Sequence, residues 1–134
     1  MNSHIQGICL DLWTPGRDVA IDEHMARFQG RSHETTTIPS KPEPTGYKIW
    51  VIAQDGYFLQ WVWHAKGAGK GPVGVPTPPE LGGSKKGTGG NKTAAVVAYL
   101  LGLLPFCTDP GRYVVYLDNL FTSLPLLKYL RSRG

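Results

Sequence analysis

Two aspartates stand where the chain could carry out chemistry. Asp22 lies within a predicted strand over residues 19–25, and Asp118 directly follows a predicted strand over residues 113–117. A carboxylate in apolar surroundings is costly unless water, a cation or a metal ion stabilises it. If the two strands are neighbours, the two carboxylates form a hard oxygen site suited to Mg²⁺ or Mn²⁺. The alternative is that each aspartate only caps the turn that follows it.

The other chemical motifs are weaker. The histidines show none of the usual metal-ligand spacings, although His24 shares a strand face with Asp22. Segment 69–74 fits the glycine pattern of dinucleotide-binding loops, but prolines follow it where a helix should begin. Segment 87–93 resembles a phosphate loop, but Asn91 stands in place of the required glycine. We therefore expect no nucleotide cofactor.

Three strands are predicted in the first half of the chain, over residues 19–25, 47–53 and 57–64. The last two flank Asp55-Gly56, which predicts an antiparallel hairpin because both turn positions favour positive φ. In the first strand, alternation assigns one face to four residues: Val19, Ile21, Glu23 and Met25. Asp22 lies on the other face, between Ala20 and His24.

The second half predicts a helix over 92–104, the strand over 113–117 and a final helix over 124–133. A helical crossover places its two flanking strands parallel in one sheet. The hairpin occupies one side of the strand over 19–25, so the strand over 113–117 should lie on its other side, buried on both faces. The resulting order, β-β-β-α-β-α, predicts an α/β fold with a ribonuclease-H-like mixed sheet. Because the helix over 92–104 is apolar all round, we expect exposed apolar surface on it.

Composition sets wider limits. The chain has 134 residues, 41% of them hydrophobic, which predicts one domain with a real core. Its net charge of +4 permits a polyanionic partner without identifying one. Two cysteines, no signal peptide and no apolar run long enough for a bilayer predict a soluble intracellular protein with no membrane partner. Residues 66–90, rich in glycine and proline, should form a flexible insertion that buries no apolar surface.

Several long segments resemble the piggyBac-type transposase family. Residues 21–32, IDEHMARFQGRS, are similar to the first catalytic-aspartate block of that family, and residues 115–127, VYLDNLFTSLPLL, to the second. Residues 38–42, 46–50 and 130–134 continue the similarity in the same order. The resemblance covers nearly the whole chain, with the insertion over 66–90 as its main gap.

The resemblance implies a ribonuclease-H-like catalytic core that uses three aspartates and two divalent metal ions, Mg²⁺ or Mn²⁺, to cut and join DNA. By this similarity Asp22 is the first catalytic and metal-binding aspartate and Asp118 is the second. The implied partner is transposon-end DNA, the implied location is the nucleus, and a homo-oligomer is a further expectation. Four basic residues become candidate DNA-phosphate contacts: Arg27, Arg31, Lys41 and Lys48.

The sequence departs from the family pattern at the third catalytic aspartate. The family's third aspartate follows well after its second block, and neither Asp55 nor Asp109 fits that role. We therefore interpret residues 1–134 as a single partial transposase catalytic domain, incomplete at its C-terminus and inactive alone, so that enzymatic activity is uncertain. The alternative is a domesticated, non-catalytic module that binds DNA or a protein.

Overall fold

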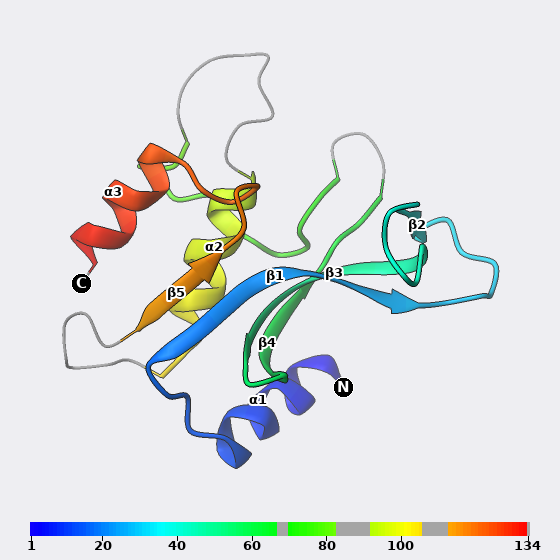
Figure 1. Cartoon of the computed structure of the whole chain (residues 1–134), viewed down its shortest axis with the longest axis horizontal. Coiled ribbons are helices and arrows are strands. Elements are labelled where there is room, and N and C mark those ends of the chain that lie inside the picture. Colours follow the sequence, from blue (N-terminus) through cyan, green and yellow to red (C-terminus); the bar gives the residue numbers. More distant parts are fainter. Residues whose placement is uncertain (67–69, 83–91, 106–112, 134) are drawn as a thin grey trace.

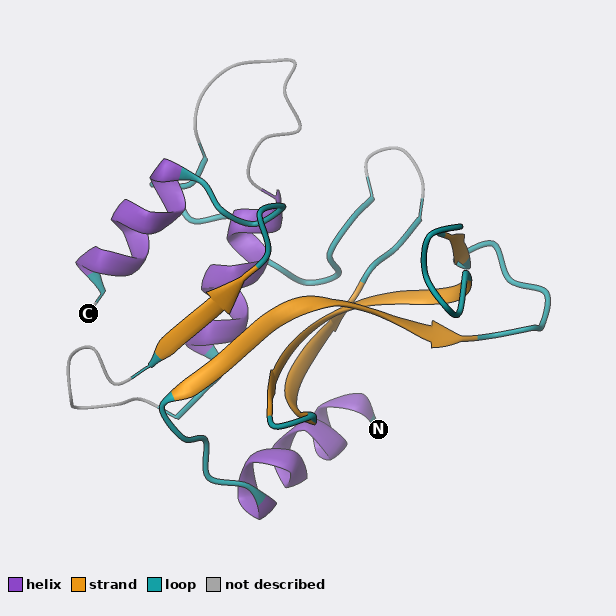
Figure 2. Ribbon diagram, viewed as in Figure 1, coloured by secondary structure: helices purple, strands orange, loops and turns teal. Residues whose placement is uncertain are grey.

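The computed structural model describes residues 1–66, 70–82, 92–105 and 113–133 (Figure 1). Its elements are α1 (Asn2–Leu12), β1 (Asp18–Arg27), β2 (Thr36–Thr37), β3 (Thr45–Gln54), β4 (Tyr57–Trp63), α2 (Lys92–Gly102), β5 (Val114–Leu117) and α3 (Leu124–Ser132). The strands form one sheet that contains both parallel and antiparallel pairs (Figure 2). The fold is therefore α/β with a mixed sheet.

Strand β1 lies between β3 and β5 and organises the sheet. It pairs antiparallel with β3, and β3 pairs antiparallel with β4. The predicted turn joins β3 to β4, with φ of 50° at Asp55 and 79° at Gly56. On its other side β1 pairs parallel with β5, from Asp18 opposite Val114 to Ile21 opposite Leu117. The predicted hairpin and the predicted parallel neighbour are both confirmed.

The main hydrophobic cluster lies on one face of the sheet, beneath α2 and α3, and on the other face Ile49 and Val51 of β3 are also buried. The alternation predicted for β1 is confirmed, because Val19, Ile21 and Met25 are buried and Asp22 is exposed. From the C-terminal part of the chain, Phe121 and Leu126 complete this core. The face of β1 that carries Asp22 therefore stays open to solvent.

The expectation of exposed apolar surface on the helix over 92–104 is wrong for the described residues. Helix α2 packs against β3, β4 and α3, and no large apolar side chain on it is exposed. In the described chain, the exposed large apolar side chains of helices belong to α1 and α3. An all-round apolar helix is explained here by burial on several sides.

Two further predictions are corrected. Strand β5 is not buried on both faces: it lies at the edge of the described sheet, and Tyr116 on it is 60% exposed. In the described part of the glycine- and proline-rich segment, 70–82, Leu81 is fully buried and Val75 packs against the core. Scattered apolar residues anchor a segment whose average composition predicts a loop. Asn91, Cys107 and Asp109 lie outside the described residues.

Helix α1 was not predicted, because none of its residues is buried and its pattern gives no core-facing stripe. Hydrogen bonds attach it to β4, and Leu10 packs against the core. The Gln6 side chain donates to the Trp61 carbonyl at 2.7 Å, and Gln60 donates back to the Gln6 carbonyl at 2.8 Å. None of the helices in the described ranges has the length and apolar character needed to cross a membrane.

Candidate functional site

The two predicted aspartates lie level at one end of the β1–β5 pair. The last paired residues are Ile21 and Leu117, and Asp22 and Asp118 follow them directly. In a parallel pair, residues at matching positions share a face, so the two carboxylates belong to the same exposed face. Two residues that are 96 positions apart in the sequence therefore follow the same end of one strand pair.

Both carboxylates have the same local geometry. Asp22 Oδ1 accepts the backbone N–H of Glu23 at 2.7 Å, and Asp118 Oδ1 accepts the backbone N–H of Asn119 at 2.6 Å. One oxygen of each side chain is thereby held toward its own backbone. The second oxygen has no hydrogen bond within the described residues and is available to water or a cation.

Exposed carboxylates that follow neighbouring strands at the same level suit a hard divalent cation, since Mg²⁺ and Mn²⁺ prefer oxygen ligands. The donor chemistry therefore fits such an ion, but the set is small. Within residues 1–66, 70–82, 92–105 and 113–133, no group of three or more His, Cys, Asp or Glu side chains could hold a metal ion. The described part of the chain supplies two carboxylates.

Tyr116 and Asp18 lie on the same face, and the sequence analysis did not identify either of them. Tyr116, two residues before Asp118, donates its hydroxyl to Asp18 Oδ1 at 3.2 Å. Ala20 lies opposite Tyr116 in the parallel register, so this hydrogen bond crosses from β5 to β1 just below the two aspartates. The tyrosine's place on the face of Asp118 is visible in the two-residue spacing, but its partner depends on the register.

His24 lies on the exposed face two residues beyond Asp22, as predicted. Its ring packs edge-on against Phe58, with ring centroids 5.2 Å apart. The contact with Phe58 gives this histidine a packing role on the same face as the aspartates.

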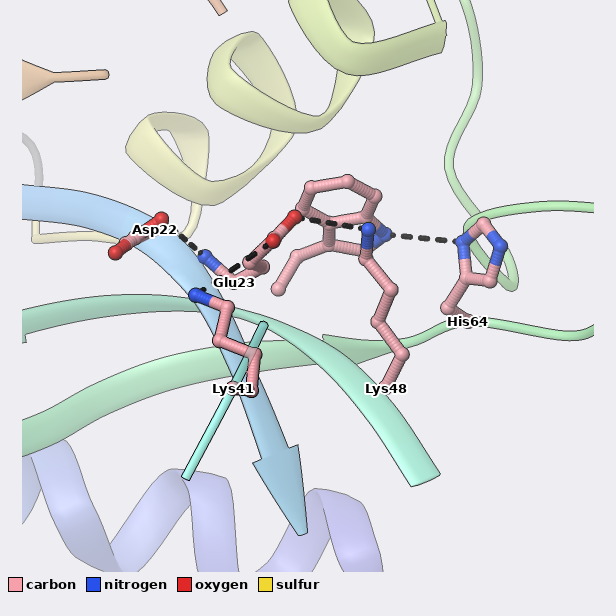
Figure 3. Close-up of polar contacts among 6 residues, drawn as sticks. Asp22, Glu23, Lys41, Lys48 and His64 are labelled. Carbon is pink, nitrogen blue, oxygen red and sulfur yellow. Dashed lines mark hydrogen bonds and ion pairs between the residues drawn. The ribbon is translucent and has the colours of Figure 1, made fainter. Parts of the chain in front are cut away.

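The opposite face of β1 carries a different polar group, drawn in Figure 3. Glu23 Oε2 lies 2.8 Å from Lys48 Nζ on β3, and Glu23 Oε1 lies 3.7 Å from Lys41 Nζ. Burial raises the pKa of the Glu23 carboxyl, but hydrogen bonds and charge from Lys48 and Lys41 outweigh it and hold the pKa below its ordinary value. Glu23 is therefore an ionised carboxylate in a half-buried position.

A histidine extends this group. Lys48 Nζ lies 4.1 Å from the centre of the Trp50 ring, and Trp50 Nε1 donates to His64 Nδ1 at 3.3 Å. Burial and the positive charges of Lys48 and Lys92 lower the pKa of His64, while Glu23 opposes them. The neutral imidazole is the form that accepts this hydrogen bond.

The four candidate DNA contacts do not form one group. Lys41 and Lys48 both pair with Glu23, on the side of the sheet away from Asp22. Arg27, at the end of β1, pairs with Glu43 at 3.3 Å, and both side chains are largely exposed. Arg31 is exposed in the segment after β1. Of the four, Arg31 has no hydrogen bond or ion pair within the described residues.

The chain matches the protein family described as "Transposase IS4" over residues 1–134. No curated protein matches it. Among solved structures it is similar to a piggyBac transposase, determined by cryo-EM as a synaptic complex with hairpin DNA. The TM-score is 0.63 and the identity is 26%, over 95% of this chain and 23% of that chain. The chain thus spans about a quarter of the length of the solved transposase.

Proposed function

Because the chain belongs to the Transposase IS4 family, we propose that it forms part of a ribonuclease-H-like catalytic core of a piggyBac-type DNA transposase. The observation that supports this proposal is the parallel pairing of β1 and β5, whose last pair, Ile21 and Leu117, is followed directly by Asp22 and Asp118. The fold, the order of the strands and the two aspartate blocks all agree with it. The solved relative that bears the likeness is itself a complex with DNA.

In this proposal Asp22 and Asp118 hold Mg²⁺ or Mn²⁺. When bound, such ions activate an attacking oxygen and stabilise the leaving oxygen of a phosphodiester. The chain's own contribution is to fix two carboxylate oxygens on neighbouring strands, each oriented by the amide that follows it. The substrate is transposon-end DNA, and the reaction takes place in the nucleus.

Two carboxylates supply few of the six oxygen ligands that Mg²⁺ takes, so without DNA phosphates the ion would depend on water for the others and bind weakly. We therefore propose that the 134-residue chain alone does not transpose DNA. Arg31 and Arg27, near the end of β1, are the exposed candidates for phosphate contacts, whereas Lys41 and Lys48 are committed to Glu23.

The second candidate function is a non-catalytic DNA-binding module. The absence of a third acidic ligand from the described residues favours it. The two functions share the DNA partner and differ in their need for the metal site.

Metal binding separates them. We expect Mn²⁺ to broaden the backbone NMR signals around Asp22 and Asp118 selectively, and Asp118→Asn to abolish the effect. A transposon-end duplex should bind with an affinity that falls steeply with salt. Broadening absent from both strands, with salt-dependent DNA binding retained, would exclude the metal site and leave the module. Robust metal-dependent nicking by the chain, lost in Asp118→Asn, would contradict the proposed inactivity.

A further inference from the structure

Glu23 occupies an unusual place for a charged residue. It lies on the core face of β1, in the alternation of Val19, Ile21 and Met25, and its side chain is only 16% exposed. Removing a carboxylate from water is costly, and a half-buried ion pair is often no more stabilising than an apolar pair of the same size. Stability alone therefore gives little reason for an ion pair at this position.

The ion pair fixes Glu23 from two directions, as Figure 3 shows. Lys48 reaches it from β3 at 2.8 Å, with its own side chain only 15% exposed and its ammonium over the Trp50 ring. Lys41 reaches it at 3.7 Å from the segment between β2 and β3. Trp50 lies directly opposite Glu23 in the β1–β3 register, so the group is anchored in the most regular part of the sheet.

The backbone of the same residue holds Asp22. Strand β1 pairs with β5 only as far as Ile21, and just beyond this point the Glu23 N–H donates to Asp22 Oδ1 at 2.7 Å. The Glu23 side chain is thus fixed by ion pairs on one face of the sheet, while its backbone amide orients the Asp22 carboxylate on the other face. Asp118 is held in the same way by the Asn119 amide, but Asn119 is exposed in a turn.

We propose that Glu23 is a positioning residue for Asp22: its ion pairs with Lys48 and Lys41 fix the peptide whose N–H orients the Asp22 carboxylate for metal binding. This inference rests on the proposed function in one step, because it takes Asp22 to be a metal ligand. Groups that orient metal ligands typically contribute 10- to 100-fold to metal affinity.

The test uses the whole chain, labelled with ¹⁵N, and Mn²⁺ as the probe. Glu23→Gln should weaken Mn²⁺ binding, followed by broadening near residues 22 and 118, by about 10-fold. It should also speed hydrogen exchange of the residue 23 amide while the paired amides of β1 and β3 keep their protection. Lys48→Met should act alike, and the double variant should lose no more than either single variant. Glu43→Gln, which breaks the exposed pair with Arg27, is the matched control and should change neither readout.

The alternatives give different results. Unchanged Mn²⁺ affinity together with an unchanged residue 23 amide overturns the proposal, and so does a loss of protection spread along the whole β1–β3 pair, which indicates a purely structural role. If the wild-type chain shows no Mn²⁺ effect, the proposed function fails, and the exchange rate of the residue 23 amide alone decides the role of Glu23. If Glu23→Gln does not fold, Lys41→Met removes the weaker partner, and the same selective loss or its absence decides.

Discussion

The two faces of β1 differ sharply in burial, although their residues alternate along a single strand. On one face Val19 and Ile21 are each 1% exposed and pack beneath α2. On the other face Ala20, Asp22 and His24 are all exposed. Core burial therefore stabilises the strand through one set of residues and leaves the other set exposed to solvent. This separation lets each face be perturbed independently.

The largest expected effect comes from the core face. Ile21→Ala should lower the free energy of unfolding by about 2–5 kcal/mol, because it removes a fully buried side chain and leaves a cavity. Chemical denaturation followed by circular dichroism measures this loss. Ala20→Ser on the exposed face is the control and should stay within about 0.5 kcal/mol. Equal losses in the two variants would contradict the division between the faces.

The division between the faces could be predicted from the sequence because it depends on local patterns. Alternation along residues 19–25 identified the buried side, Asp55-Gly56 identified the hairpin, and the crossover rule identified β5 as the parallel neighbour. These signals lie within a few residues or follow from chain topology. The catalytic roles of Asp22 and Asp118 stay predictions.

The contacts that the sequence did not reveal are long-range and polar. Glu23 and Lys48 are 25 residues apart, and they meet only because the β1–β3 register brings them together. Helix α1 has no fully buried residue and is attached to β4 by hydrogen bonds, so the apolar pattern of its sequence does not reveal it. Leu81 is fully buried, although the composition of its segment predicts no buried apolar side chain. Such contacts follow from the assembled sheet and not from any local pattern.

The next largest effect should come from the polar group within the core face. Lys48→Met should lower the free energy of unfolding by about 1–3 kcal/mol, because Glu23 then keeps only the more distant Lys41. Urea denaturation at neutral pH measures it. Arg27→Met removes the exposed partner of Glu43 and should leave stability unchanged, since exposed ion pairs contribute little. A similar loss in both variants would show that burial does not distinguish the two pairs.

A smaller effect should appear as a pH dependence. Burial and the charges of Lys48 and Lys92 lower the pKa of His64 in the folded chain below the ordinary imidazole pKa of 6.5. The folded state therefore binds the proton less readily than the unfolded state, in which the pKa is the ordinary one. The stability from the neutral imidazole is therefore complete above that value and is lost as the pH falls through the folded pKa. His64→Gln keeps an acceptor for Trp50 but does not titrate. Denaturation across this range should show a shallower pH dependence in the variant, and an identical slope would contradict the assignment.

The smallest effect on stability should come from Asp22 itself. Asp22→Asn keeps an oxygen that can accept the Glu23 N–H, and it removes a negative charge beside Asp118, so the free energy of unfolding should stay within about 0.5 kcal/mol of wild type. We expect Mn²⁺ to raise the melting temperature of the wild-type chain, because an ion that binds only the folded state stabilises it by mass action, and the same change should abolish this rise. Thermal melts with and without Mn²⁺ measure both quantities. A strongly destabilised variant would show that Asp22 stabilises the fold. A stable variant whose melting temperature does not respond to Mn²⁺ would show that Asp22, on the exposed face of β1, binds the ion.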